Sequence, residues 1–214
     1  GGHTIDSVEP IYGLVALGLV HPKYVKRNAD AKVGDRLVLG KPLGVGVLSA
    51  ALKKDRLDPE GYAQMIANTT KLNTPGPELA RLDGVHALTD ITGFGLAGHA
   101  MEMARGAGTT VRIDWTKVPL LPGVRELAGA GLVTGASGRN WAAYGHEVQL
   151  GAHLQAPDQA LLSDPQTSGG LLVSCSAEAV PEVLATFQRH GFAQAAEIGE
   201  IVQAAEGGVR LQVA

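Results

Sequence analysis

The sequence has a single cysteine, Cys175, in 214 residues, so it cannot close an intrachain disulfide. This excludes a disulfide-stapled scaffold and indicates a reducing compartment, which makes the cytoplasm the expected location. An excess of charge of one sign is also lacking, because 18 Lys and Arg against 21 Asp and Glu give a formal net charge of −3. Without the basic footprint that nucleic-acid-binding domains carry, we expect no nucleic-acid partner.

Long hydrophobic runs are absent as well. The longest candidate, Ile11 to Val20, is interrupted by Gly13 and Gly18 and falls short of the ~20 apolar residues that a membrane helix needs. We therefore expect a soluble protein without a membrane partner. The opening Gly1-Gly2-His3 has neither an initiator methionine nor the charged and apolar regions of a signal peptide, and it predicts a fragment or a processed chain.

Glycine, in contrast, is abundant: 29 residues, about twice ordinary usage. Short β-branched runs alternate with longer Ala/Leu runs at helical spacing, which predicts an α/β or α+β fold with many tight turns. Strands are expected over residues 11–20, 36–39, 85–91, 109–113 and 171–175, with 198–202 and 209–213 as a closing β pair. Helices are expected over 47–54, 59–73, 96–105, 124–130 and 178–189, and residues 135–157 are expected to form a long loop.

The most conspicuous motif, Gly93-Phe94-Gly95-Leu96-Ala97-Gly98, fits G-x-G-x-x-G between a predicted strand and a predicted helix. It is compatible with a nicotinamide dinucleotide, with Asp114 on the ribose, and equally with glycines that serve only close packing. The strand before it is polar at Thr89, Asp90 and Thr92, and a carboxylate there would repel a pyrophosphate unless a metal lay between them. Asp90, at a strand end beside helix-start amides, is therefore a candidate Mg²⁺ ligand that needs further ligands from elsewhere.

Three further segments carry polar groups suited to anions or to turns. The opening Gly1-Gly2-His3-Thr4 offers backbone amides and side-chain donors to anionic oxygens. The segment SDPQTSGGLL, Ser163 to Leu172, is either a turn locked by Asp164 and Thr167 or a binding loop. The segment GRNWAAYGH, Gly138 to His146, places a guanidinium, an amide and an imidazole in the expected loop.

Together these segments resemble the selenophosphate synthetases, or selenide, water dikinases, of the superfamily that includes aminoimidazole ribonucleotide synthetase. The matching segments, in the family's order and spacing, are GGHTID, EPIYGL, KPLGVGVL, LTDITGFGLAGH, LPGV, GRNWAAYGH and DPQTSGGLL. The resemblance implies the carboxy-terminal α/β domain of the aminoimidazole ribonucleotide synthetase-like fold over residues 21–214, a mixed sheet with helices packed on it. Residues 1–20 would be the last strand of a truncated amino-terminal ATP-binding domain.

The resemblance also implies an activity and a site. Members of the family bind ATP with several Mg²⁺ ions within a homodimer and convert selenide into selenophosphate, with AMP and orthophosphate as the other products. By position, Asp90 matches a metal-binding aspartate of the family. Gly1, Gly2, His3 and Thr4 match the family's phosphate-side nucleotide contacts, which are contributed across the dimer.

Several elements of the family's pattern have no counterpart in the chain. These are the amino-terminal glycine-rich segment, the reactive Cys or selenocysteine with its nearby Lys, and the other metal-binding aspartates, so no catalytic residue is assigned and the chain alone is expected to be inactive. Cys175, in the apolar run LLVSC, is expected to be a buried core thiol. Two alternatives stay open: a nicotinamide-dependent oxidoreductase through GFGLAG, and a non-catalytic binding or dimerisation module.

Overall fold

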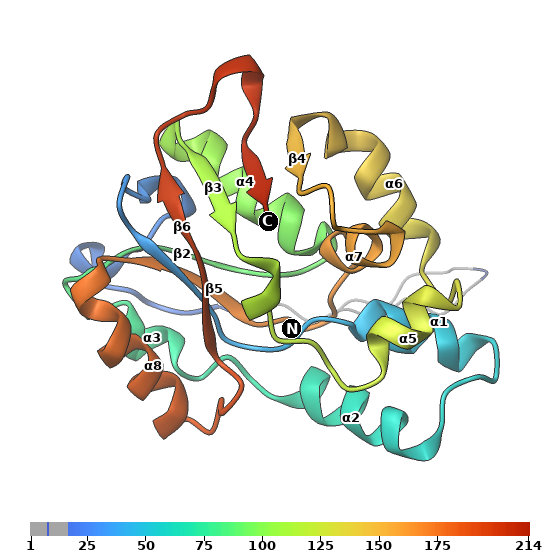
Figure 1. Cartoon of the computed structure of the whole chain (residues 1–214). Coiled ribbons are helices and arrows are strands. Elements are labelled where there is room, and N and C mark those ends of the chain that lie inside the picture. The colour runs from blue at the N-terminus through green and yellow to red at the C-terminus, as the bar shows by residue number, and fades with distance from the viewer. Residues whose placement is uncertain (1–7, 9–16) are drawn as a thin grey trace.

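A seven-stranded mixed sheet forms the centre of the structure (Figure 1). The computed structural model describes residue 8 and residues 17–214. The strands are β1 (Arg36–Leu39), β2 (Val85–Asp90), β3 (Thr110–Ile113), β4 (Val148–Leu150), β5 (Leu171–Cys175), β6 (Ala196–Val202) and β7 (Leu211–Val213). Their order in the sheet is β2-β5-β1-β6-β3-β7-β4. Neighbours from β2 to β3 are antiparallel, whereas β7 is parallel to both β3 and β4, so the predicted mixed sheet is confirmed.

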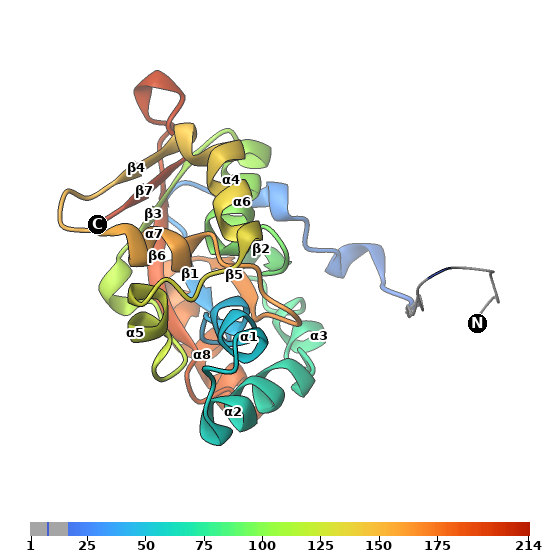
Figure 2. The ribbon, with the colours of Figure 1, turned by 90° about the vertical axis from the view of Figure 1, so that its right-hand side faces the viewer.

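The described residues form eight α-helices, joined in places by short 3-10 turns. The helices are α1 (Val45–Lys53), α2 (Pro59–Thr70), α3 (Gly76–Leu79), α4 (Gly95–Ala107), α5 (Val124–Gly129), α6 (Gly135–Tyr144), α7 (Ala156–Leu162) and α8 (Val180–Arg189). Figure 2 shows α4 and α6 together on one side of the sheet, with α1 and α2 below them.

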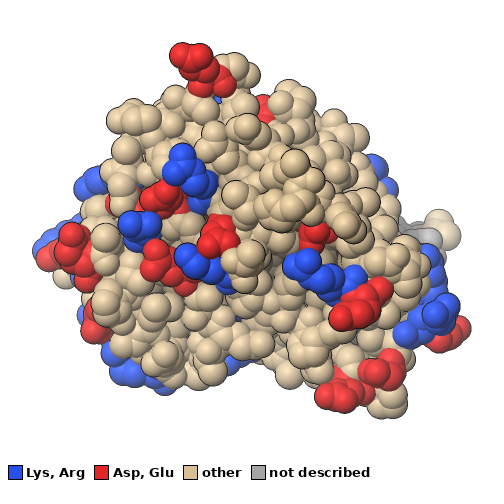
Figure 3. All heavy atoms as spheres, in the orientation of Figure 1, with Lys and Arg blue, Asp and Glu red and all other residues tan. Residues whose placement is uncertain are grey.

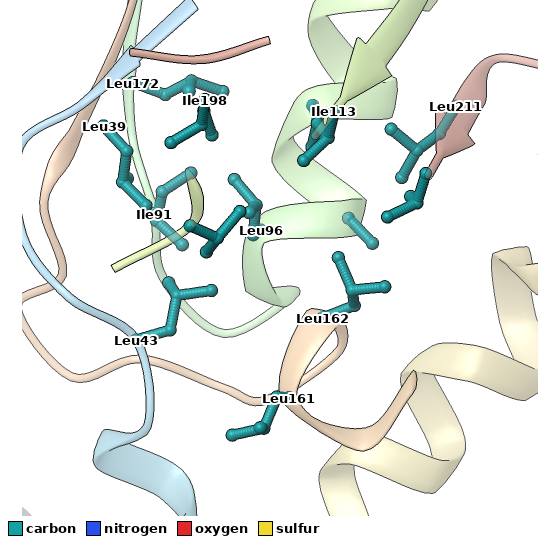
Figure 4. Packing of buried hydrophobic residues seen from close by; sticks show 14 of the residues in the cluster. Leu39, Leu43, Ile91, Leu96, Ile113, Leu161, Leu162, Leu172, Ile198 and Leu211 are labelled. Carbon is teal, nitrogen blue, oxygen red and sulfur yellow. The ribbon is translucent and has the colours of Figure 1, made fainter. Parts of the chain in front are cut away.

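Apolar side chains gather in two clusters because successive strand residues point to opposite faces. In β1, Leu39 belongs to the larger cluster, whereas Val38 belongs to the smaller one beside α8. Figure 4 shows Leu39 and Leu172 from the sheet, Leu96 from α4 and Leu162 from α7 in the larger cluster. Both faces of β1 and β5 are covered, which explains why these strands are almost wholly apolar in sequence.

The sheet surface at β3 and β6 is polar. Arg112 and Arg36 both pair with Glu200, at 3.0 and 3.2 Å between nitrogen and oxygen. Figure 3 shows acidic and basic side chains interspersed over this surface. Opposite charges are thus satisfied in place, and this face presents no single-sign patch that would attract a polyanion.

Helix ends follow the local signals in the sequence. Asp58 caps α2 by accepting a hydrogen bond from the Gly61 amide at 2.7 Å, and Pro59 is the first helical residue, as predicted. The helix predicted over 96–105 extends from Gly95 through Gly106 to Ala107. It ends at Gly108, which adopts the left-handed conformation with φ of 67°.

The prediction of a long loop over residues 135–157 is wrong. This region contains α6, β4 and the start of α7. The first of these helices is capped by Thr134, whose hydroxyl oxygen accepts from the Ser137 amide at 3.1 Å. Only Ser137 and Tyr144 of α6 are buried, so its small residues leave no apolar period for sequence reasoning to detect.

The predicted pairing of 198–202 with 209–213 is also wrong. Strand β3 lies between the two, antiparallel to β6 and parallel to β7. Val111 of β3 aligns with Ile201 on one side and with Leu211 on the other. Apolar residues at strand spacing predicted each strand. Its neighbours in the sheet depend on long-range pairing and packing, which a short-range pattern does not predict.

The predicted strand over residues 11–20 lies mostly outside the described residues. Residues 17–20, which are described, belong to neither a helix nor a strand. The division of the chain at residue 20 stays a prediction.

Candidate functional site

The candidate site is the turn between β2 and α4, which carries the motif GFGLAG. Asp90 is the last residue of β2, opposite Leu171 of β5, and its side chain is exposed. The chain then passes through Thr92 and Gly93 to Phe94, which is 62% exposed although it is aromatic. The turn is closed by a hydrogen bond from the Gly95 amide to the Thr92 carbonyl oxygen at 3.1 Å.

The three glycines of the motif meet different surroundings. Gly95 has a φ of +70°, and a Cβ there would lie 2.7 Å from the carbonyl carbon of Ser163. At Gly98 a Cβ would lie 2.5 Å from Phe94 Cβ and 3.2 Å from Tyr144 Cε1. Gly93 alone of the three has no atom within 4 Å of its Cβ position. Thus Gly95 and Gly98 serve internal packing, and Gly93 is the one with space for a ligand.

This arrangement argues against the nicotinamide alternative. In a dinucleotide fingerprint the second glycine lets the pyrophosphate approach, and the two strands flanking the helix are parallel neighbours. Here the backbone of Ser163 occupies the space beside Gly95, and three strands separate β2 from β3. Asp114, which would bond the ribose, caps a 3-10 turn through the Thr116 amide and hydroxyl, and those hydrogen bonds keep the pKa of its carboxyl low.

The segment from Asp164 to Gly170 lies against the candidate turn and holds it in place. The Gln166 amide donates to the Thr92 carbonyl oxygen at 3.0 Å, and the Ile91 amide donates to that of Gly170 at 2.9 Å. A Cβ on Gly169 would lie 2.1 Å from the Ile91 carbonyl oxygen, so this contact requires glycine.

The same segment also caps α1. The buried Asp164 accepts from the Gly46 amide at 2.9 Å and from Gln166 Nε2 at 2.8 Å. Gln166 Oε1 in turn accepts from the amides of Gly44 and Val45, at 3.2 and 3.3 Å. Burial raises the pKa of the Asp164 carboxyl to about 7. Of the two sequence interpretations, the locked turn is thus observed, with Gln166 as the partner in place of Thr167.

Sequence reasoning missed Lys41, which is 1% exposed. Its Nζ donates to three carbonyl oxygens, those of Asn68 at 3.0 Å, Lys71 at 2.6 Å and Ser168 at 2.6 Å. Burial lowers the pKa of this ammonium to about 8. The lysine ties the end of α2 to Ser168, whose φ is +51°. A lysine directly after an apolar strand, in LVLGKPLG, was the available signal.

The segment GRNWAAYGH lies in α6 and in the first two residues of the 3-10 turn after it, and it contacts the candidate turn. Asn140 Nδ2 donates to the Gly93 carbonyl oxygen at 2.8 Å, and the Tyr144 hydroxyl donates to that of Phe94 at 2.6 Å. Arg139 is exposed. The sequence placed these residues in a loop and gave them no role.

Two further predictions concern the opening residues and the lone cysteine. Gly1, Gly2, His3 and Thr4 lie outside the described residues, so their nucleotide contacts stay a prediction. Cys175 is fully buried in β5, and burial raises the pKa of its thiol to about 12, which confirms the expected core thiol.

Asp90 fits a hard cation only as one ligand among several. No group of three or more His, Cys, Asp or Glu residues that could hold a metal occurs in the described part of the chain. Mg²⁺ commonly binds to one or two carboxylates and completes its shell with water and substrate phosphates. An exposed carboxylate three residues before Gly93, whose Cβ position is open, suits that role.

A hollow lies elsewhere on the molecule. It measures about 350 Å³ and lies between α1, α2 and α5, with Leu48, Gly61, Pro122 and Leu127 among its lining residues. None of the residues of the turn from Asp90 to Gly95 lines it. The exposed residues Asp90, Gly93 and Phe94 make the candidate turn an open surface.

Comparison with known proteins identifies the family. Residues 32–212 match the family described as AIR synthase related protein, C-terminal domain. The chain belongs to this family. It is 68% identical over 213 residues to a selenide, water dikinase of Burkholderia pseudomallei, a match that covers 100% of this chain and 59% of that relative. The predicted resemblance to the selenide, water dikinases is confirmed, and the chain spans about three fifths of that relative's length.

Solved structures show the same fold at low sequence identity. The Escherichia coli hydrogenase maturation protein HypE matches with a TM-score of 0.64 and 21% identity, over 89% of this chain and 49% of that one. A HypE protein solved in complex with ATP matches with a TM-score of 0.56 and 19% identity, over 88% of this chain and 50% of that one. Among residues 17–214, no helix has the length and apolar character needed to cross a bilayer.

Proposed function

We propose that the chain acts as the carboxy-terminal part of a selenide, water dikinase, which makes selenophosphate from selenide and ATP and releases AMP and phosphate. The observation that carries this proposal is the 68% identity to such an enzyme along the entire chain. The relative's remaining length would supply an amino-terminal part. The full-length protein would then contain these 214 residues together with that part.

ATP is proposed as the substrate and Mg²⁺ as the metal. An ATP complex of a protein with the same fold supports the first assignment. When bound, Mg²⁺ neutralises phosphate charge and orients the transferring group, which is most of what a protein contributes to phosphoryl transfer. Asp90 would supply one carboxylate ligand, and the open face of Gly93 would let phosphate oxygens come close to the backbone.

The remaining contacts would come from outside the described residues. Gly1, Gly2, His3 and Thr4 would bind the nucleotide phosphates across a homodimer, as the family pattern implies. The lone thiol of the chain is buried, so the reactive Cys or selenocysteine would lie in the amino-terminal part. A reducing cytoplasm would suit both the selenide substrate and that residue.

A product assay tests this proposal. The full-length protein is incubated anaerobically with ATP, Mg²⁺ and selenide, and the products are followed by phosphorus NMR. We expect selenophosphate and AMP to appear in equal amounts, and product formation to stop when selenide is omitted. ADP as the end product, or ATP consumption that does not depend on selenide, would refute the assignment.

A further inference from the structure

We infer that Asn140 and Tyr144 of α6 are positioning residues, which set the conformation of the Gly93–Phe94 turn and thereby the placement of Asp90. The inference rests on the proposed function, because Asp90 matters to the reaction only if it binds the metal. Neither residue is assigned a contact with substrate. Both would act through the backbone of the turn.

Asn140 joins the turn to the end of α7. Its Nδ2 donates one hydrogen bond to the Gly93 carbonyl oxygen at 2.8 Å and another to the Ser163 carbonyl oxygen at 3.1 Å. Because both partners are acceptors, only the nitrogen end of the side-chain amide can face them. Both N–H groups of the amide are therefore used, one on each segment.

Tyr144 holds the next peptide of the turn. Its hydroxyl donates to the Phe94 carbonyl oxygen at 2.6 Å, and the side chain is buried at 7% exposure. Burial raises the pKa of this phenol, so it remains a protonated donor throughout the physiological range. The tyrosine ring packs closely against Gly98, where a Cβ would lie 3.2 Å from Tyr144 Cε1.

The two side chains act as a unit. Positions 140 and 144 are four residues apart, which puts them on one face of α6. They bind the carbonyl oxygens of two successive residues, Gly93 and Phe94. Fixing these two carbonyls restricts the peptide planes on both sides of Phe94, those of the Gly93–Phe94 and Phe94–Gly95 peptides. This is the part of the turn with open space for a ligand, and Asp90 lies three residues before it.

Outer partners that orient metal ligands commonly contribute 10–100-fold to metal affinity or activity. Asn140→Asp keeps the shape of the side chain but replaces the two donors with an oxygen that repels both carbonyls. Tyr144→Phe removes one oxygen and leaves the Phe94 carbonyl without its donor. The matched controls are Gln149→Glu, which makes the same amide-to-acid change at an exposed site, and Tyr62→Phe at an exposed tyrosine.

The experiment measures two quantities on each variant of the full-length protein. The first is hydrogen exchange at the Gly95 amide, whose bond to Thr92 closes the turn. The second is the Mg²⁺ concentration that gives half-maximal ATP turnover. In Asn140→Asp and Tyr144→Phe we expect the exchange rate of the Gly95 amide and the half-maximal Mg²⁺ concentration each to rise by roughly tenfold. Turnover should be largely recovered at saturating Mg²⁺. Neither quantity should change in the controls.

A merely structural role would lower the folded fraction without changing the Mg²⁺ requirement. The inference is overturned if both variants keep their Mg²⁺ requirement within twofold of wild type while Asp90→Asn raises it. Should Asn140→Asp fail to fold, Tyr144→Phe alone decides. If Asp90→Asn also leaves the requirement unchanged, it is the proposed role of Asp90 as a metal ligand that fails, whereas the product assay tests the proposed function itself. The exchange rate of the Gly95 amide then decides whether the two side chains hold the turn.

Discussion

Gln166 donates a hydrogen bond from Nε2 to Asp164 Oδ2 at 2.8 Å, inside the buried segment that lies between α1 and the candidate turn. The pair accepts from the amides of Gly44, Val45 and Gly46 at the start of α1. The Gln166 backbone amide also bonds to Thr92 in the turn that bears Asp90. The stability of this segment is therefore linked to the geometry of the candidate site.

Asp164 should make the stability of the chain depend on pH. Burial raises the pKa of its carboxyl from 3.8 to about 7, so the folded state binds the proton more tightly than the unfolded state does. The stabilisation is complete below pH ~4 and is lost as the pH rises through about 7, an effect of at most about 4 kcal/mol. Asp164→Asn stays neutral at every pH and should therefore remove this dependence of stability on pH.

Thermal unfolding between pH 4 and pH 8 measures this effect. The Tm of Asp164→Asn minus that of wild type should increase with pH across this range. Asp55→Asn, at an exposed position, is the control and should show a constant difference. Parallel Tm curves for Asp164→Asn and wild type would contradict the assignment.

Lys41→Met should destabilise the chain. Methionine has a similar length but no donor, so the carbonyls of Asn68, Lys71 and Ser168 would lose their partner in a buried place. We expect a loss of about 2–4 kcal/mol in the free energy of unfolding, measured by urea denaturation. Lys53→Met, at the end of α1, should cost little, and equal stabilities for the two variants would count against the role of Lys41.

Gly95→Ala should lower the stability of the chain, whereas Gly93→Ala should lower the activity of the full-length protein. At Gly95 a Cβ meets the backbone of Ser163 and the φ is positive, so we expect a loss of about 2–4 kcal/mol in stability. At Gly93 the Cβ position is open, so stability should hold while ATP turnover of the full-length protein falls. Urea denaturation and steady-state turnover separate the two effects. A stable Gly95→Ala variant would show that the turn can move away from Ser163.

NAD should not bind to the chain. The space beside Gly95 is filled by Ser163, and Asp114 is engaged with Thr116. Thermal shift with up to millimolar NAD should therefore give no stabilisation, with or without Mg²⁺. If NAD stabilised the wild type but not Asp114→Ala, the nicotinamide alternative would stand again.

Local chemistry made much of the fold predictable. Asp58-Pro59 marks a helix start because an aspartate side chain accepts orphan amide protons and proline suits the first helical position. The uninterrupted run from Leu171 to Cys175 is typical of a strand covered on both faces, and β5 has those bounds. Strand neighbours were not predictable, since β3 lies between β6 and β7 and pairs there with residues about 90 and 100 positions away in the sequence, such as Val111 with Ile201 and Leu211.

The candidate site was predictable only in part. Asp90 could be selected as a candidate because a carboxylate at a strand end, beside the amides of a helix start, suits a hard cation. The residues that hold the turn could not be selected, because Asn140 and Tyr144 bind it across 47 and 50 positions of sequence. Lys41 was missed for a similar reason, since its three acceptors lie far from it in the sequence. They are the carbonyl oxygens of Asn68 in α2, of Lys71 just after α2, and of Ser168.

Substitution of Asp90 tests the central claim most directly. In the full-length protein, Asp90→Asn keeps the side-chain shape but removes one anionic ligand, while Asp114→Asn makes the same change at a partly exposed carboxylate that follows another strand. The measurement is selenide-dependent AMP formation as a function of Mg²⁺ concentration. We expect Asp90→Asn to raise the Mg²⁺ requirement by roughly tenfold or more with an unchanged Tm, and Asp114→Asn to match wild type. Turnover by Asp90→Asn within twofold of wild type at limiting Mg²⁺ would contradict the account.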